Sequence, residues 1–123
     1  MRDIETREDI LLLMEKFYNK LLADPSIHHF FIQTTNVSQH LPEHFELLTT
    51  FWEQALFLRG GYFNNMIEVH KKVHDQSAFS AKHYKTWLTH LFDTIDEYFS
   101  GPKSEQMKTQ SLNMATVMQM KLA

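Results

Sequence analysis

Apolar residues recur along this chain at intervals of three and four, which is the spacing of one face of an α-helix. Glycine and proline, which interrupt helices, occur only 3 times each. Few segments alternate apolar and polar residues as a half-buried strand would. The pattern therefore predicts an all-helical protein built from about six helical segments.

Capping signals place the first of these segments. Thr6 and Asp9 have the spacing of a capping box, and the apolar periodicity that follows predicts a helix over residues 10–22. Asp24–Pro25 is a second start signal and predicts a short helical turn. The polar stretch 32–39 is predicted as a connection without helix.

The rest of the chain contains four further predicted helices. Each opens at a residue that favours a helix start: Pro42, Asn65, Ser80 and, approximately, Ser104. Gly60–Gly61 is expected to end the first of the four, and Gly101–Pro102 the third. No internal repeat or linker interrupts the pattern, so residues 1–123 are expected to form a single domain.

Composition and charge exclude several classes of protein. The chain has no cysteine, which rules out disulfides, thiolate metal sites and cysteine nucleophiles. A net charge of −3 provides no basic surface for nucleic acid. The longest apolar run, Ile10–Met14, is too short to span a bilayer, and the charged start MRDIETRED is unlike a secretory signal. We therefore expect a cytoplasmic protein without nucleic-acid or membrane partners.

Two pairs of histidines four positions apart are the main chemical signal. They are His40 with His44 and His70 with His74. A zinc protease motif needs Glu directly after the first histidine, but Leu41 follows His40 and Lys71 follows His70, and the carboxylates of a di-iron bundle are incomplete. Phosphate-binding loops and a nucleophile elbow are also missing. Haem needs only one histidine and an apolar clamp, which suits a chain with 43% hydrophobic residues.

Longer stretches make the chain similar to a known family. These stretches are MEKFYNKL, FFIQ, HFELLTTFWEQALFLRGGYFNNMIEVH and HYKTWLTHLFDTIDEYFSGPKSEQMKTQSLNMATVMQMKL. Together they resemble the truncated haemoglobins, most closely their third group, over about residues 8–122. The resemblance implies an all-α, globin-like fold, the truncated two-over-two helical sandwich, with haem b as cofactor.

The resemblance also implies roles for individual residues. Tyr18 and Trp87 match the distal residues that hydrogen-bond the bound ligand, and His44 matches a distal position beside them. The residues expected to contact the cofactor are Phe31, His44, Leu48, Phe51, Trp52, Tyr62, His74 and Trp87.

The proximal iron ligand can be assigned in two ways. Counting forward from Tyr62, His70 falls where the family's proximal histidine is expected. Counting backward from FSAKHYKTW, His74 has the spacing of other truncated haemoglobins. His70 is the favoured ligand and His74 the alternative. Met66, where many relatives have proline, is a departure from the family pattern.

The function implied by the resemblance is the binding of dioxygen and nitric oxide at a pentacoordinate haem iron, for redox chemistry more than for bulk transport. If the protein is an enzyme, we expect a nitric oxide dioxygenase or a peroxidase-like haem protein that needs a separate reductase. We expect a monomer or weak homodimer. Two alternatives stay open, a cofactor-free helical interaction module and a histidine-based non-haem metal protein.

Overall fold

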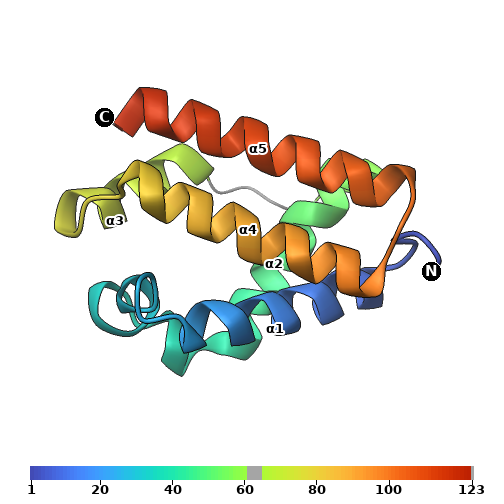
Figure 1. Cartoon of the computed structure of the whole chain (residues 1–123), viewed down its shortest axis with the longest axis horizontal. Coiled ribbons are helices and arrows are strands. Elements are labelled where there is room, and N and C mark those ends of the chain that lie inside the picture. Colours follow the sequence, from blue (N-terminus) through green and yellow to red (C-terminus); the bar gives the residue numbers. More distant parts are fainter. Residues whose placement is uncertain (61–64, 123) are drawn as a thin grey trace.

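The computed structural model describes residues 1–60 and 65–122, and these residues contain helices but no strands (Figure 1). The helices are α1 (Arg7–Ala23), α2 (Leu41–Phe57), α3 (Met66–Gln76), α4 (Ala81–Tyr98) and α5 (Pro102–Leu122). Two short helical turns, η1 (Phe30–Thr34) and η2 (Val37–Gln39), lie between α1 and α2. The prediction of an all-helical chain is confirmed.

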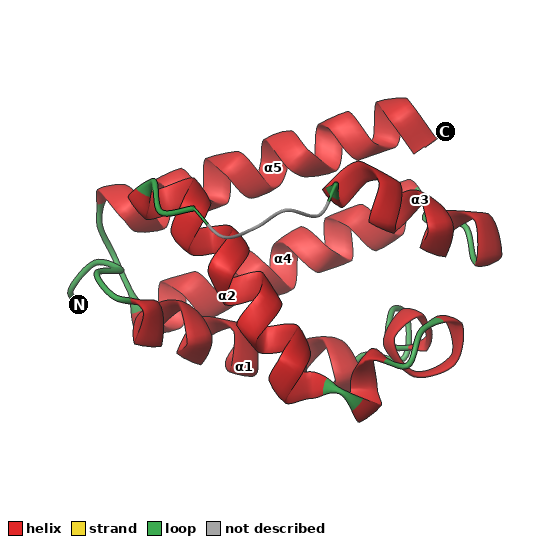
Figure 2. Cartoon of the chain, turned by 180° about the vertical axis from the view of Figure 1, so that it is seen from behind, coloured by secondary structure: helices red, strands yellow, loops and turns green. Residues whose placement is uncertain are grey.

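The four long helices pack in two layers. One layer consists of α4 and α5, which run side by side in opposite directions (Figure 1). The other consists of α1 and α2, with α2 crossing the direction of the other helices when seen from behind (Figure 2). Helix α1 contacts both α2 and α4, which joins the layers. None of the described helices is long and apolar enough to cross a membrane.

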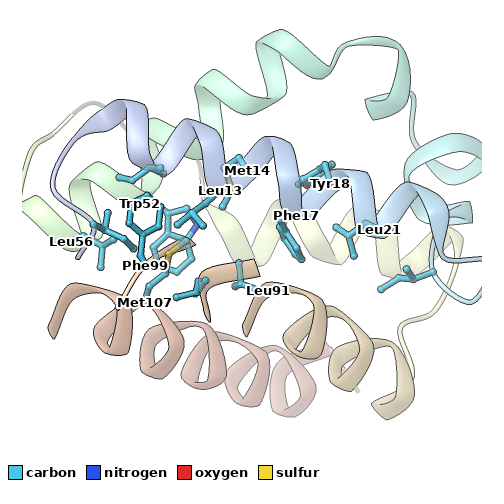
Figure 3. Packing of buried hydrophobic residues seen from close by; sticks show 14 of the residues in the cluster. Leu13, Met14, Phe17, Tyr18, Leu21, Trp52, Leu56, Leu91, Phe99 and Met107 are labelled. Carbon is cyan, nitrogen blue, oxygen red and sulfur yellow. The ribbon is translucent and has the colours of Figure 1, made fainter. Parts of the chain in front are cut away.

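The core lies where these helices meet. Apolar side chains spaced three and four apart on α1, among them Leu13, Met14 and Phe17, face inward because the helical period places them on one side (Figure 3). Leu91 from α4 and Met107 from α5 complete the cluster and are almost fully buried. Burial of this surface is the main force that holds the two layers together.

The predicted helix starts agree with the structure where local side chains determine them. The Thr6 hydroxyl accepts a hydrogen bond from the amide of Asp9, and the Asp9 carboxylate accepts one from the amide of Thr6. Asn65 and Ser80 cap α3 and α4 through the amides three residues further on. A capping side chain and its amide are neighbours in sequence, so sequence alone identifies the cap.

Two predicted boundaries are wrong. The stretch 32–39 contains part of η1 and all of η2, although it was predicted to be a connection without helix. Helix α2 ends at Phe57 instead of at the glycine pair, because Leu58 adopts the left-handed conformation with φ 59°. The amide of Leu58 then bonds to the carbonyl of Glu53. Glycine usually occupies such a position, since a Cβ atom is strained there.

Replacing Leu58 with Gly is expected to stabilise the protein by about 0.5–1 kcal/mol, because relief of the left-handed strain exceeds the entropy that glycine loses. Leu58 is 89% exposed, so little packing is lost with its side chain. Urea denaturation of the two proteins measures the difference. Leu58→Ala keeps the Cβ atom and should give no gain; an equal gain in that variant would show that strain at this position is not the cause.

The segment before α1 holds the start of α5. The carboxylate of Asp3 accepts hydrogen bonds from the amides of Lys103 and Ser104, at 2.7 and 2.8 Å. Next to it Ile4 is 1% exposed. A Cβ atom on Gly101 would lie 2.6 Å from the Asp3 side chain, and its φ of 148° also favours glycine. Asp3 therefore caps a helix about a hundred residues away in sequence.

Stability should fall in acid through Asp9. Hydrogen bonds from the Arg2 guanidinium lower the pKa of this carboxyl from 3.8 to about 2, with help from the amides of Glu5 and Thr6 and against the effect of burial. Because the pKa of the folded state is below that of the unfolded state, the stabilisation is complete above about pH 4 and is lost as the pH falls towards 2. Arg2 is half exposed, so solvent screens the pair, and we expect Asp9 to contribute about 1–2 kcal/mol to the free energy of unfolding at neutral pH.

Asp9→Asn is expected to remove this contribution and to flatten the dependence of the unfolding free energy on pH between 4 and 2. Urea denaturation at several pH values measures both effects. Asp93→Asn, which changes an exposed carboxylate on α4, is the matched control and should leave the pH dependence as it is. If the unfolding free energy of Asp9→Asn still falls steeply between pH 4 and 2, the acid sensitivity belongs to other carboxylates.

Candidate functional site

A cavity of about 230 Å³ lies between the α3 side of the molecule and the segment from α1 to α2. Helix α3 and the turns before α2 lie at the same end of the molecule, with α3 above the turns in Figure 2. The lining is mainly apolar and aromatic, and it includes seven polar or polar-tipped residues: Tyr18, Thr35, His44, His70, His83, Tyr84 and Trp87. A second cavity of about 90 Å³ adjoins it and shares Tyr18, Leu48, His70, Trp87 and Met118 as lining residues.

Tyr18 and His44 form a hydrogen-bonded pair in the larger cavity. The hydroxyl of Tyr18 on α1 lies 2.7 Å from Nε2 of His44 on α2. Burial raises the pKa of Tyr18 far above its usual value, so the hydroxyl keeps its proton. Burial, followed by the charge of nearby His70, lowers the pKa of His44. Both groups are therefore neutral at physiological pH and can exchange donor and acceptor roles with the histidine tautomer.

Aromatic rings surround this pair and fix its position. The ring of Tyr18 meets Phe31, His44 and Phe45 edge to face, with centroids 5.2–5.5 Å apart. Trp87 of α4 packs against Phe17 at 5.8 Å in the same manner. Such contacts restrict the rotamers of the polar residues, so their hydrogen-bonding atoms stay directed at one region of the cavity.

His70 lines both cavities and has one nitrogen already bonded. Its Nδ1 atom lies 2.8 Å from the carbonyl oxygen of Met66, so Nδ1 carries the proton and donates it. None of the described residues hydrogen-bonds to Nε2, which therefore has a free lone pair. Burial lowers the pKa of His70, which favours the neutral ring. A neutral imidazole whose other nitrogen donates to a carbonyl is the usual form of a histidine metal ligand.

His74 is placed differently. Its Nδ1 atom accepts a hydrogen bond from the backbone amide of Phe79, at 2.9 Å, and its ring packs against the ring of Phe79. The residue lines neither of the two cavities. His74 thus stabilises the connection between α3 and α4, and of the two histidines only His70 reaches the cavity.

Comparison with known proteins shows which fold the chain has. No family model matches the sequence, and no curated protein matches it. The crystal structure of the group III truncated hemoglobin from Campylobacter jejuni superposes with a TM-score of 0.86 over 100% of this chain and 96% of that chain, at 21% identity. The chain has the truncated globin fold. The predicted two-over-two helical architecture is thereby confirmed.

The truncated globin fold brings most of the predicted site residues together. Phe31, Leu48 and Trp87 line the larger cavity with Tyr18 and His44. The predicted aromatic pair Phe51 and Trp52 lines the smaller one. Tyr62, also expected to contact a cofactor, lies outside the described residues. Roles in cofactor binding stay predictions for all of these residues.

Several lining residues of this truncated globin fold were not predicted from sequence. The polar ones are Thr35, before α2, and His83 and Tyr84 on α4; the apolar ones include Phe30, Phe79 and Met118. Tyr84 precedes Trp87 by three positions, so helical spacing predicts it on the same inward face as Trp87, although not as a site residue. Phe30 and Phe79 lie beside the ends of helices, and no periodic signal marks them.

The same fold offers no obvious site for a bare metal ion. Across residues 1–60 and 65–122, no three histidine, aspartate or glutamate side chains converge closely enough to hold one. The histidine-based non-haem alternative therefore has no candidate ligand set in that part of the chain.

Proposed function

We propose that this protein binds one haem b in the larger cavity, with Nε2 of His70 as the iron ligand. A small diatomic gas such as dioxygen or nitric oxide would bind on the side of Tyr18, His44 and Trp87. The observation that carries the proposal is the free lone pair of His70 Nε2 in an apolar cavity that Tyr18 and His44 also line. The truncated globin fold supports it.

The residues present fit this cofactor. A porphyrin ring is flat and apolar, and Leu48, Phe31 and Met118 provide apolar contacts in the cavity. Neutral His70 is already held by Met66, so little ordering is needed when it coordinates a metal. When bound, haem would supply an iron centre for diatomic ligands and for electron transfer. The protein supplies the ligand, the exclusion of water and the hydrogen bonds around it.

The distal residues can hold a polar ligand in place. Trp87 has an indole N–H with no partner among the described residues, and it can only donate. The Tyr18 hydroxyl donates to His44 when Nε2 of His44 is unprotonated, and becomes free to donate into the cavity when that nitrogen carries the proton. The Trp87 N–H and the Tyr18 hydroxyl, whose direction depends on the tautomer of His44, favour a partly charged ligand over a neutral one.

This arrangement favours redox chemistry over bulk transport. Strong distal hydrogen bonds slow the escape of dioxygen, which suits a reaction with nitric oxide or peroxide better than reversible delivery. Turnover would then require electrons from a separate reductase.

The test is titration of the purified chain with haemin. We expect a Soret band that saturates at one equivalent, and iron as the bound metal in elemental analysis of the product. A chain that retains no stoichiometric haemin would overturn the proposal in favour of a cofactor-free interaction module. Zinc or copper in place of iron in the isolated protein would point to a non-haem metal protein.

A further inference from the structure

Methionine side chains are concentrated around the two cavities. Four of the seven methionines in the chain line at least one cavity: Met14, Met66, Met114 and Met118. Met118 lines both, as Trp87 does, so it lies where the two cavities adjoin. The chain has no cysteine, so thioethers are its only sulfur groups. Most of the sulfur in this protein therefore belongs to residues beside the proposed haem site.

Helix α5 carries four methionines in three different surroundings. Met114 and Met118 are one helical turn apart and line the cavities. Met107 is 0% exposed and lines neither cavity, and Met120, which is 77% exposed, lines neither as well. An oxidant in bulk solvent would reach Met120 first, whereas an oxidant produced inside the cavities would reach Met114 and Met118. The pattern of oxidation along α5 therefore reveals where an oxidant is produced.

The methionine thioether can react with a peroxide without any other reactant. Its sulfur is polarizable, and three rotatable bonds allow the side chain to turn towards a cavity. A sulfur lone pair forms a bond to one oxygen of hydrogen peroxide while the O–O bond breaks, and the other oxygen leaves as water with both protons. Sulfur loses two electrons and peroxide gains them. The product is methionine sulfoxide, which is polar and can be reduced again.

We propose that Met114 and Met118 are oxidation sites, whose thioethers hydrogen peroxide converts to sulfoxides when haem is bound. This inference rests on the proposed function, because the haem iron is what makes peroxide reactive inside the cavity. Trp87 lines both cavities as well and has an oxidisable indole ring. Oxidation of the two thioethers thus consumes peroxide that would otherwise damage this distal donor.

The experiment compares three forms of the full chain. One form has no porphyrin, one contains haemin, and one contains zinc protoporphyrin, which has the same ring around a metal without redox chemistry. Each form is treated in the dark with a small excess of hydrogen peroxide, and catalase ends the reaction. Mass spectrometry of proteolytic peptides then measures the sulfoxide fraction at each methionine. The zinc form is the control for an occupied cavity.

We expect the sulfoxide fractions at Met114 and Met118 to be about fivefold or more higher with haemin than with zinc protoporphyrin. Met120 should be oxidised equally in all three forms, because bulk peroxide reaches it, and Met107 should stay reduced. Equal fractions at Met114 and Met118 with the two porphyrins, or as much sulfoxide at Met107 as at Met114, would overturn the inference while the proposed function stands. A wild type that retains no haemin would overturn both.

A double variant tests the protective role. Met114→Leu combined with Met118→Leu removes both thioethers and nearly conserves the side-chain volume. In the haemin form of this variant, oxidation of Trp87 should rise about threefold or more above the wild type, measured in the same peptides. Met120→Leu, which removes an exposed thioether from the same helix, is the matched control and should leave Trp87 oxidation unchanged. The same result in the double variant would contradict protection of Trp87.

Discussion

His70→Ala will bind haemin more than about 100-fold more weakly than the wild type and will lose the Soret band of the reduced carbonyl form. Changing the hydrogen bonds that support a metal ligand typically reduces affinity about 10–100-fold, and removing the ligand itself should reduce affinity more. His70 is the histidine whose free nitrogen reaches the cavity, and Nδ1 is already held by Met66. Absorbance titration with haemin and the carbonyl spectrum measure the effect.

His74→Ala is the matched control, because it removes the same side chain one helical turn away. Its Nδ1 is occupied by the amide of Phe79, so we expect near-normal haemin binding with a modest loss of stability. Added imidazole should restore the carbonyl spectrum in His70→Gly and have no effect on the wild type. A spectrum lost in His74→Ala and kept in His70→Ala would reverse the assignment.

Tyr18→Phe and Trp87→Phe will each raise the dissociation rate of dioxygen by about 10–100-fold, since each removes one hydrogen bond to a ligand that carries partial charge. Phenylalanine keeps the ring of Tyr18 and its contact with Phe31, so packing changes little. The double variant should release dioxygen faster than either single variant. The combined change in activation free energy should be less than the sum of the two single changes, because both donors share one ligand. Stopped-flow mixing of the oxygenated protein with carbon monoxide measures these rates.

Tyr84→Phe provides the control for this second prediction. It removes the hydroxyl of a residue that lines the same cavity, and it acts at the amino end of α4 instead of at the pair formed by Tyr18 and His44. Its dioxygen dissociation rate should remain within about twofold of the wild type, since the distal hydrogen bonds remain. Unchanged dissociation in Tyr18→Phe would mean that its hydroxyl is committed to His44 when the ligand is bound.

Sequence predicts those parts of the fold that neighbouring residues determine. The caps at Thr6, Asn65 and Ser80 are local, and all three occur as predicted. The end of α2, in contrast, depends on residues far away in sequence. The ammonium group of Lys103 on α5 donates to the carbonyl of Leu56, at 2.7 Å, and so binds one of the free carbonyl groups at the end of α2. No pattern within α2 contains that contact, and Leu58 gives no glycine-like signal.

The candidate site likewise has residues that the sequence identifies and a choice between two histidines that it does not. Tyr18, His44 and Trp87 interrupt apolar helical faces, so periodicity and resemblance select them, and the structure brings all three to one cavity. His70 and His74 could not be separated by counting along connections of variable length. The hydrogen bonds of their Nδ1 atoms distinguish them, and these depend on the backbone of Met66 and Phe79.

The cap that Asp3 provides for α5 has a consequence for folding kinetics. Its bonds to the amides of Lys103 and Ser104 close a loop of about a hundred residues, which is entropically costly until the intervening helices have packed. We therefore expect these hydrogen bonds to form after the rate-limiting step of folding. In a chevron plot, Asp3→Asn should therefore raise the unfolding limb and leave the folding limb in place. That result would mean that the first residues of the chain influence how long the folded state lasts more than how quickly it is reached.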